Sequence, residues 1–274
     1  MKKANIQEHY NQENLFFKIL DAMSKSGLEV NKLARENFSE MDEFHIMGHL
    51  GTKLLAEAVG FRSKMKVLDL GCGIGGASRF IANTFNTDVT GIDITEEYVQ
   101  TAKLISEKVG INNVTFEQAD ATDLPFDANT FDVVWTQHVQ MNIANKKTLF
   151  KEISRVLKPG GKIAYFDILS TSNDELIYPL PWAENANLSY TCSSIELDQL
   201  LNTTGFSLDN KMNLTQEAIS WFKKFFKNVQ AQGGIPKVSS KLLMGENTPI
   251  KLKNLFRNLI DAKCEVEMGV FIKK

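Results

Sequence analysis

Residues 67–76, from Val67 to Gly76, read VLDLGCGIGG, and this stretch decides the fold. Apolar or β-branched positions, broken by the single acid Asp69, lead into a glycine cluster, and a helical pattern follows. This order predicts a buried parallel strand, a tight turn and the N-terminus of a helix. Glycines permit the sharp turn and let a ligand approach backbone amides. A dinucleotide site also reads G-x-G-x-x-G, which Gly71, Gly73 and Gly76 satisfy, so the stretch alone leaves the ligand open.

Three further features restrict the choice of ligand. Asp69 lies two residues before the first glycine, where a carboxylate repels a pyrophosphate but attracts an ammonium group. Residues 88–93, DVTGID, predict a second strand that ends in Asp93, at the distance from the glycines where a partner for ribose hydroxyls belongs. Residues 156–167, VLKPGGKIAYFD, predict a helix end, a Pro-Gly-Gly turn and another strand.

Strand and helix signals alternate from Lys66 to Leu169 and then become irregular. We expect strands at residues 66–70, 88–93, 114–118, 131–136, 162–169 and 206–212, and a final one through Val266 to Ile272. Right-handed crossovers then predict an α/β fold, with a doubly wound, mostly parallel seven-stranded sheet, helices on both faces, an antiparallel last strand and a helical cap. The expected domains are an N-terminal helical cap over residues 1–62 and a Rossmann-like domain over residues 63–274. Cap inserts are expected at about residues 170–193 and 214–262.

Composition and charge restrict the partners. The 274 residues carry a formal net charge of -2, which gives no electrostatic reason to expect nucleic acid or an anionic membrane as a partner. Cys72, Cys192 and Cys264 lie far apart, so a disulfide framework or a zinc site is not expected. Without an apolar signal segment or an 18-residue apolar run, the chain is predicted to be cytoplasmic.

The glycine loop and the Leu157–Gly161 turn, LKPGG, together resemble the class I, Rossmann-like methyltransferases that depend on S-adenosylmethionine. This resemblance implies S-adenosylmethionine as the cofactor and S-adenosylhomocysteine as its product, with no metal. It also implies that Gly71, Cys72 and Gly73 lie against the cofactor, with the Gly71 and Gly73 amides touching it. The segment 136–137 would pass under its methionine end, contributing mainly the backbone of Gln137.

Three acids then have expected roles. Asp69 would hold the methionine ammonium, or else only stabilise the turn. Asp93 would accept the ribose hydroxyls, with Ile94 under the adenine, or else cap the helix that follows. Asp120 would accept the adenine N–H while the Ala121 amide reads the ring edge, and Asp123 is the competing acid there.

Candidates for methyl transfer come from the segment after the fourth strand and from the cap. His138 is the first choice as base or proton relay, with a purely structural hydrogen bond as the alternative. Phe44 and His45 fall in an irregular break between cap helices, as lid residues do, and are expected to contact the cofactor. Trp135, Trp182 and Trp221 are candidates to enclose a methylammonium, although Trp221 more plausibly belongs to the core.

A narrower resemblance extends over nearly the whole chain. It rests on the glycine loop, the LKPGG turn, Tyr10 and residues 42–45 (DEFH), 137–143 (QHVQMNI) and 178–183 (YPLPWA), and it points to the sarcosine/dimethylglycine-type N-methyltransferases. The nearby phosphoethanolamine methyltransferases pair a lid tyrosine with a histidine after the fourth strand. Tyr10 matches the tyrosine, but Asn142 stands at the histidine position, four residues after His138. The resemblance therefore implies Tyr10, His138 and Asn142 as catalytic candidates.

We therefore expect a methyltransferase that acts on a small molecule, with an amine nitrogen such as that of sarcosine or dimethylglycine as the first choice. The alternative is an O- or C-methyltransferase for an apolar or ring-containing metabolite, such as a quinone or lipid precursor. A cofactor-binding protein without catalysis is a third possibility, which the intact Asp69, Asp93 and Asp120 oppose. No nucleic acid or membrane partner is expected, and the protein is expected to be a monomer or homodimer.

Overall fold

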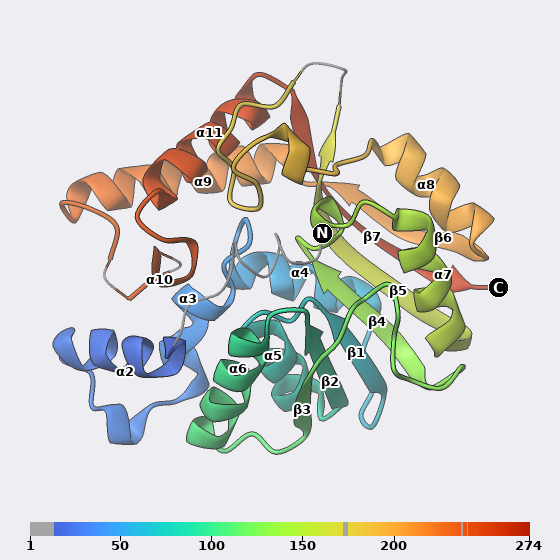
Figure 1. Ribbon diagram of the computed structural model, residues 1–274, viewed down its shortest axis with the longest axis horizontal. Helices are drawn as coiled ribbons and strands as arrows, with labels where there is room; N and C mark the ends of the chain where they lie inside the picture. The colour runs from blue at the N-terminus through green and yellow to red at the C-terminus, as the bar shows by residue number, and fades with distance from the viewer. Residues whose placement is uncertain (1–13, 172–174, 237, 240) are drawn as a thin grey trace.

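The computed structural model describes residues 14–171, 175–236, 238–239 and 241–274. These residues build a seven-stranded sheet with helices against both faces (Figure 1). The strands are β1 (Lys66–Leu70), β2 (Asp88–Asp93), β3 (Val114–Gln118), β4 (Phe131–Gln137), β5 (Leu157–Ser170), β6 (Phe206–Asn213) and β7 (Cys264–Lys273).

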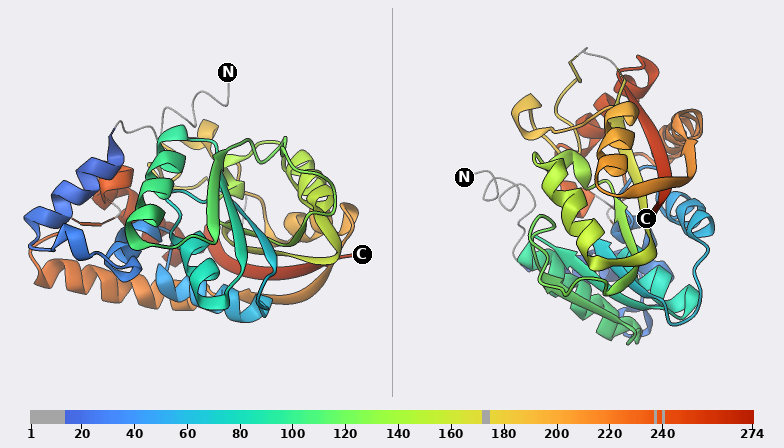
Figure 2. Two further views of the ribbon diagram at one scale, coloured as in Figure 1. Left: turned by 90° about the horizontal axis from the view of Figure 1, so that it is seen from below. Right: turned by 90° about the vertical axis from the view of Figure 1, so that its right-hand side faces the viewer.

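The strand order is β3-β2-β1-β4-β5-β7-β6. Neighbours from β3 to β5 are parallel, whereas β7 is antiparallel to both β5 and β6. Figure 2 shows β7, in red, running through this half of the sheet. The predicted fold class is confirmed. Because the order reverses between β1 and β4, the connections that leave the carboxyl ends of these two strands run to opposite faces of the sheet and leave the crevice where such sheets bind ligands.

Three of the predicted strands, β1, β2 and β3, have the predicted bounds. Strand β5 begins five residues earlier than expected, at Leu157, and its pairing with β4 shifts register between Phe131 and Val133. The Pro-Gly-Gly turn therefore lies inside the strand as a bulge. Pro159 has no amide to donate to the ladder, and Gly160 adopts a φ of 74°, which lets the chain bulge there.

The helices are α2 (Leu15–Lys25), α3 (Ser39–Asp42), α4 (His49–Val59), α5 (Gly76–Phe85), α6 (Glu96–Val109), α7 (Lys146–Val156), α8 (Ser194–Thr203), α9 (Thr215–Ala231), α10 (Lys241–Met244) and α11 (Thr248–Ile260). Short 3-10 turns occur at η1 (Val30–Lys32), η2 (Arg35–Phe38), η3 (Gln140–Asn142) and η4 (Ala186–Leu188). None of the helices in the described part of the chain combines the length and apolarity needed to cross a membrane.

Alternation along β1 divides the core between the two faces of the sheet. Val67 belongs to the cluster that contains Trp135 and side chains of α4, α5, α9 and α11. Leu68 and Leu70 belong to the cluster on the other face, which contains Phe150 of α7 and side chains of α8. The sheet is therefore packed against a layer of helices on each of its two faces.

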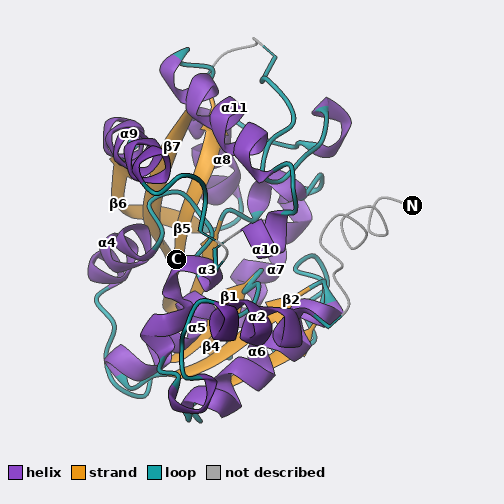
Figure 3. Cartoon of the chain, turned by 90° about the vertical axis from the view of Figure 1, so that its left-hand side faces the viewer, coloured by secondary structure: helices purple, strands orange, loops and turns teal. Residues whose placement is uncertain are grey.

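The N-terminal helix α2 packs away from the sheet, against α6. Leu15, Ile19 and Met23 form a third cluster with Tyr98 and Ile105 of α6. Figure 3 shows α2 beside α6, with α9 and α11 at the opposite end of the molecule. The segment from α2 to α4 therefore runs across the carboxyl end of the first strands and brings residues 42–45 over the glycine loop.

Candidate functional site

A cavity of about 450 Å³ opens at the carboxyl ends of β1 to β4. This volume lies within the range of small-molecule sites, roughly 300–1,000 Å³. Every residue predicted to bind the cofactor lines it, namely Phe44, His45, Asp69, Gly71, Cys72, Gly73, Asp93, Ile94, Asp120, Ala121 and Gln137. His138 and Asn142 also line it, whereas Tyr10 lies outside the described residues.

The glycines of the loop are required by neighbouring protein atoms. Gly71 has a φ of 68°, and a Cβ added there would lie 2.4 Å from Cγ2 of Val139. A Cβ added at Gly73 would lie 3.3 Å from the ring of Phe44. The Gly73 amide donates a hydrogen bond to Asp93 Oδ2 at 3.0 Å, so the protein itself uses this donor. The lack of side chains at these positions lets β1, the segment after β4 and the lid segment converge around the cavity.

Asp69 is the most deeply placed acid of the cavity, with 3% of its surface exposed. Its Oδ2 accepts a hydrogen bond of 2.5 Å from Ser78 Oγ on α5. Burial raises the pKa of Asp69 to about 7, although the Ser78 hydrogen bond lowers it and the nearby charge of Asp93 raises it further. A cationic ligand would favour the ionised form of this carboxyl group.

Asp93 holds the glycine loop and the start of α6 together. One carboxylate oxygen accepts the Gly73 amide, and the other accepts the Thr95 amide at 2.9 Å. Burial raises the pKa of Asp93, while these amides oppose the shift. Asp93 is not the N-cap of α6, which is Thr95, but its carboxylate orients the backbone just before that helix.

Asp120 follows β3 and also forms a local turn. Its Oδ1 accepts hydrogen bonds from the amide and the hydroxyl of Thr122, each at 2.8 Å. The competing residue, Asp123, is exposed and does not line the cavity. The residue favoured from the sequence is thus the one that faces the site.

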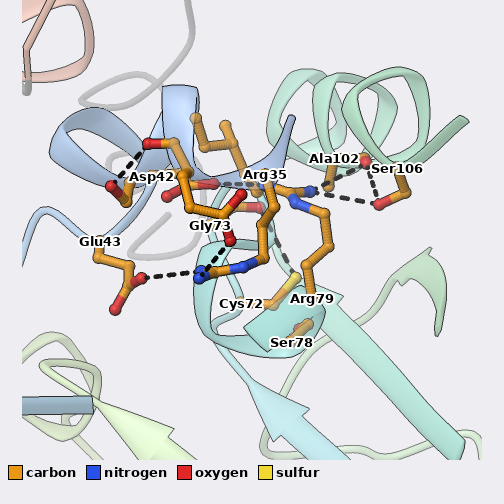
Figure 4. Close-up of polar contacts among 12 residues, drawn as sticks. Arg35, Asp42, Glu43, Cys72, Gly73, Ser78, Arg79, Ala102 and Ser106 are labelled. Carbon is orange, nitrogen blue, oxygen red and sulfur yellow. Dashed lines mark hydrogen bonds and ion pairs between the residues drawn. The ribbon is translucent and has the colours of Figure 1, made fainter. Parts of the chain in front are cut away.

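The N-terminus of α5 is covered by an internal carboxylate (Figure 4). A Cβ added at Gly76 would lie 2.4 Å from the carbonyl oxygen of Asp42 and 2.7 Å from its carboxyl carbon. Asp42 Oδ2 accepts a 2.7 Å hydrogen bond from Arg79 Nη2, and both side chains are almost wholly buried. Dinucleotide enzymes hold a pyrophosphate at the corresponding helix N-terminus. Because Asp42 lies beside the start of α5 and Asp69 lies nearby, the glycine loop is unsuited to binding a pyrophosphate and better suited to binding a cation.

His45 and Gln137 belong to one polar network at the base of the lid. Thr52 Oγ1 on α4 lies 3.1 Å from His45 Nε2 and 3.4 Å from Gln137 Oε1. Gln137 Oε1 also accepts a 3.0 Å hydrogen bond from Trp135 Nε1, whereas its Nε2 is buried with no hydrogen-bond partner among the described residues. The amide group of Gln137 is therefore a donor left for a ligand, in addition to the backbone expected from the sequence.

His138 directly follows β4 and adopts a left-handed backbone, with a φ of 55°. Its ring stacks on Phe166 at 5.5 Å and meets the His45 ring edge-on at 5.8 Å. Its Nε2 is buried and has no hydrogen-bond partner within the described chain. Burial lowers the pKa of His138 well below its usual range, and burial likewise lowers the pKa of His45 to about 4. A neutral imidazole with a free nitrogen can accept a proton or a hydrogen bond from a ligand.

The outer wall of the cavity was only partly foreseen. Trp182 lines it, but Trp135 is fully buried in the core, and Trp221 packs partly against that core. Wall residues that the sequence interpretation missed include Tyr98, Asn145, Asn187, Leu188 and Tyr190. Residues 186–190 belong to the cap insert expected at about residues 170–193. Their polar and aromatic composition is the one sequence feature that could have indicated a ligand-facing wall. Within the described chain, α9 supplies no residue to this wall.

Within residues 14–171, 175–236, 238–239 and 241–274, no three or more His, Cys, Asp or Glu side chains gather in a way that would hold an ion. The expectation of a metal-free cofactor remains a prediction.

Comparison with known proteins places these features in a family. Residues 61–231 match the family model described as "Methyltransferase domain". A sterol 24-C-methyltransferase of Gibberella zeae is 38% identical over 126 residues, which are 44% of this chain and 33% of that protein. Phosphoethanolamine N-methyltransferase 3 of Arabidopsis thaliana is 37% identical over 117 residues, 42% of this chain and 24% of that protein. The matches thus span about a third and a quarter of these relatives.

Among solved structures, a putative sarcosine dimethylglycine methyltransferase from Galdieria sulphuraria has a similar fold. It superposes with a TM-score of 0.67 over 82% of this chain and 84% of that chain, at 21% identity. At this identity the likeness concerns the fold, which agrees with the strand order described above.

Proposed function

The chain belongs to the methyltransferase-domain family, a class I, Rossmann-like group, and we propose that it transfers a methyl group from S-adenosylmethionine to a small-molecule acceptor. One observation carries the proposal. Asp69 lies near the end of β1, Asp93 ends β2 and Asp120 follows β3, and all three line one cavity, beside the lid and the segment after β4. An acid at each of these strand ends matches the three polar parts of this cofactor, its ammonium, its ribose and its adenine.

The residues present fit the cofactor. Asp69 is placed to hold the ammonium group, because a buried carboxyl group that shares one hydrogen bond with Ser78 is stabilised in its ionised form by a cation. Asp93 is placed for the ribose hydroxyls, and Asp120 and Ala121 for the adenine edge, with Ile94 against its face. When bound, S-adenosylmethionine supplies an electrophilic methyl group on a sulfonium centre.

His138 takes the proton that the acceptor atom loses. His138 lines the cavity, and its buried Nε2 has no hydrogen-bond partner among the described residues. Burial keeps the ring neutral, so this nitrogen carries a free lone pair. Gln137 Nε2 offers a donor beside it, and Asn142 on η3 offers a side-chain amide from the next turn. Phe44 and His45 cover the glycine loop and restrict water. Tyr10 remains a predicted second member of the proton path.

The acceptor atom that we propose is an amine nitrogen, following the sarcosine/dimethylglycine-type resemblance. A neutral base close to the reacting atom supports this choice, because an ammonium must lose its proton before its nitrogen can attack. The second candidate is an oxygen or carbon atom of an apolar or ring-containing metabolite. It is favoured by the similarity to the sterol 24-C-methyltransferase and by the apolar wall residues Ile143 and Leu188.

The domain bounds, the cellular location and the oligomeric state remain predictions. We propose the cap over residues 1–62 and the Rossmann-like domain over residues 63–274, with the inserts given above. A cytoplasmic location and a monomeric or homodimeric state are likewise proposed from the sequence.

A thermal-shift titration tests the cofactor. S-Adenosylmethionine and S-adenosylhomocysteine are expected to raise the melting temperature, whereas NAD(H) is not, because binding to the native state stabilises it by mass action. Asp93→Asn keeps the shape of the side chain while weakening its interaction with ribose hydroxyls, and it is expected to reduce the shift. Asp123→Asn changes an exposed acid three residues after Asp120 and serves as the matched control. A shift caused by NAD(H), or an unchanged shift in Asp93→Asn, would contradict the assignment.

Methyl transfer itself is measured by the release of S-adenosylhomocysteine with amine acceptors. The expected result is acceptor-dependent release that requires His138. Binding of S-adenosylmethionine without release in the presence of any amine, alcohol or apolar ring compound would refute catalysis while leaving cofactor binding intact.

A further inference from the structure

The charges around the cavity bear on the acceptor, and this inference rests on the proposed methyl transfer. We propose that the acceptor is an amine with an apolar body and without a carboxylate or phosphate group. This differs from the amino-acid acceptors suggested by the sequence resemblance, because those acceptors carry a carboxylate beside the amine.

The first support is the acidic wall. Asp42, Asp69, Asp93 and Asp120 all line the cavity, and the described lining residues include no lysine or arginine. His45 and His138 add no positive charge, because burial lowers the pKa of each below the neutral range. The charge of Asp42 is balanced by Arg79, but a carboxylate or phosphate brought into this cavity would meet the carboxyl groups of Asp69, Asp93 and Asp120 at low dielectric. That is unfavourable, whereas an ammonium would be attracted.

The second support is that three cations, Arg79, Arg35 and Lys146, already have anionic or carbonyl partners. Each of them contacts or directly follows a residue that lines the cavity or adjoins a lining residue in sequence. Arg79 pairs with Asp42 at 2.7 Å in a fully buried contact. Arg35 reaches Glu36 at 3.1 Å and Glu43 at 3.7 Å, and it lies 5.4 Å above the Phe80 ring.

Lys146 follows the segment after β4 and is the lysine closest in sequence to the proposed base. Its Nζ donates to the carbonyl oxygens of Gln140 at 2.6 Å and of Ile143 at 3.1 Å. To bind a carboxylate or phosphate, one of these cations would have to leave a buried partner, which would then be left unsatisfied.

The third support is the outer wall, where Trp182, Leu188 and Tyr190 come from one segment. Trp182 Nε1 donates to Ser189 Oγ at 2.9 Å, and the Tyr190 hydroxyl donates to the carbonyl oxygen of Asn187 at 3.1 Å. Their polar tips are thus used within the segment, and what remains for a ligand is ring surface. Aromatic rings favour an apolar body or a substituted ammonium, the latter through cation–π contact.

Pairs of acceptors that differ by one anionic group test the proposal. The pairs are N-methylethanolamine against sarcosine, N,N-dimethylethanolamine against dimethylglycine, ethanolamine against phosphoethanolamine, and phenethylamine against phenylalanine. Each compound is added to the protein with saturating S-adenosylhomocysteine, and the melting temperature is measured. Turnover with S-adenosylmethionine is followed separately.

In each pair that responds, we expect the member without the anionic group to bind more tightly by about tenfold or more, which corresponds to about 1.4 kcal/mol. Phenethylamine is expected to bind best because of its apolar ring. Equal or tighter binding of the carboxylate or phosphate members overturns the proposal. So does the failure of every amine to bind a protein that binds S-adenosylhomocysteine. If S-adenosylhomocysteine itself gives no shift, the proposed function has failed instead.

A charge introduced into the wall gives an independent test. Leu188 lies on η4 at the cavity, half-buried. Leu188→Lys is expected to shift the preference within the dimethylglycine pair toward dimethylglycine by about tenfold, since it supplies an unpaired cation. Leu188→Met changes shape without charge and is the matched control. An unchanged preference in Leu188→Lys, with S-adenosylhomocysteine still bound, contradicts a charge-based selection.

Discussion

Replacing Arg79 by methionine would leave Asp42 buried without its cationic partner. The guanidinium group donates to Asp42 Oδ2 at 2.7 Å and to the carbonyl oxygen of Ile74 at 2.8 Å. It also reaches the carbonyl oxygen of Ala102 and Ser106 Oγ, each at 3.3 Å (Figure 4). Neither side chain of the pair is appreciably exposed, so water cannot take the place of the lost partner.

The expected cost follows from this burial. Removing one member of a buried ion pair typically costs about 3–5 kcal/mol, because an uncompensated charge remains. Because Arg79 also donates to other buried acceptors, we expect the loss of unfolding free energy to lie near the upper end of this range, at about 4–5 kcal/mol. The total stability of a typical protein is about 5–15 kcal/mol. At a urea dependence of about 3 kcal/mol per molar, the unfolding midpoint should fall by about 1.5 M.

Urea unfolding followed by circular dichroism measures the change. Asp42→Asn combined with Arg79→Met removes both charges and should recover a substantial part of the loss, because no unpaired carboxylate remains. Arg257→Met is the matched control, since Arg257 pairs with Asp261 on an exposed surface and should contribute at most about 1 kcal/mol. A loss below about 1 kcal/mol in Arg79→Met, or no recovery in the double variant, would refute the reasoning.

Four other outcomes are expected. The affinity for S-adenosylmethionine, measured by calorimetry, should rise with pH by up to about tenfold per unit below pH 7 and should be constant above it. The reason is that the pKa of Asp69, raised to about 7, leaves this carboxyl group protonated at lower pH. Asp69→Asn should flatten this profile. The stability of the ligand-free protein should change in the opposite sense, because the folded pKa of Asp69 exceeds its usual value of 3.8. The stabilising contribution of Asp69 is present below pH 4 and is lost as pH rises through 7. His138→Gln should lower kcat by about 10²–10⁴ while leaving S-adenosylmethionine affinity unchanged, and unchanged turnover would exclude His138 as the base. Gly71→Ala, whose Cβ would meet Val139, should destabilise the protein by about 1–3 kcal/mol more than Gly110→Ala, as measured by calorimetric melting. Gly110 is the control because it shares the positive φ but has open space around it. Equal losses in the two variants would contradict the packing argument.

The acidic residues at the strand ends of the site could be predicted from the sequence because they lie within or next to short segments with strand periodicity. Asp69 lies one residue before the end of its strand and Asp93 ends the next, and both strands have the predicted bounds. Parallel strands bring their carboxyl ends to one edge, so the approximate meeting of these acids follows from the fold class alone.

The remaining features depend on contacts between distant segments, which periodicity does not report. The Asp42–Arg79 pair joins residues 37 positions apart, and an acid before a helix break has the same local pattern whether it is paired or exposed. The bulge in β5 could not be read from the Pro-Gly-Gly turn, because a turn before a strand and a bulge within one use the same residues. Leu188 and Tyr190 join the wall through a segment without periodicity, so no local rule marks their position.

Asp42 occupies the space beside the start of α5 as a tethered group, packed against Gly76 and paired with Arg79. Because Asp42 is part of the same chain, its effective concentration there is that of an intramolecular group, of millimolar order or higher. Free phosphate, sulfate or a nucleotide from solution would have to displace it and would also leave Arg79 to be re-paired. Exchanging loop residues alone would therefore not convert this glycine loop to dinucleotide binding. Such a conversion would first require release of the Ser39–Asp42 helix.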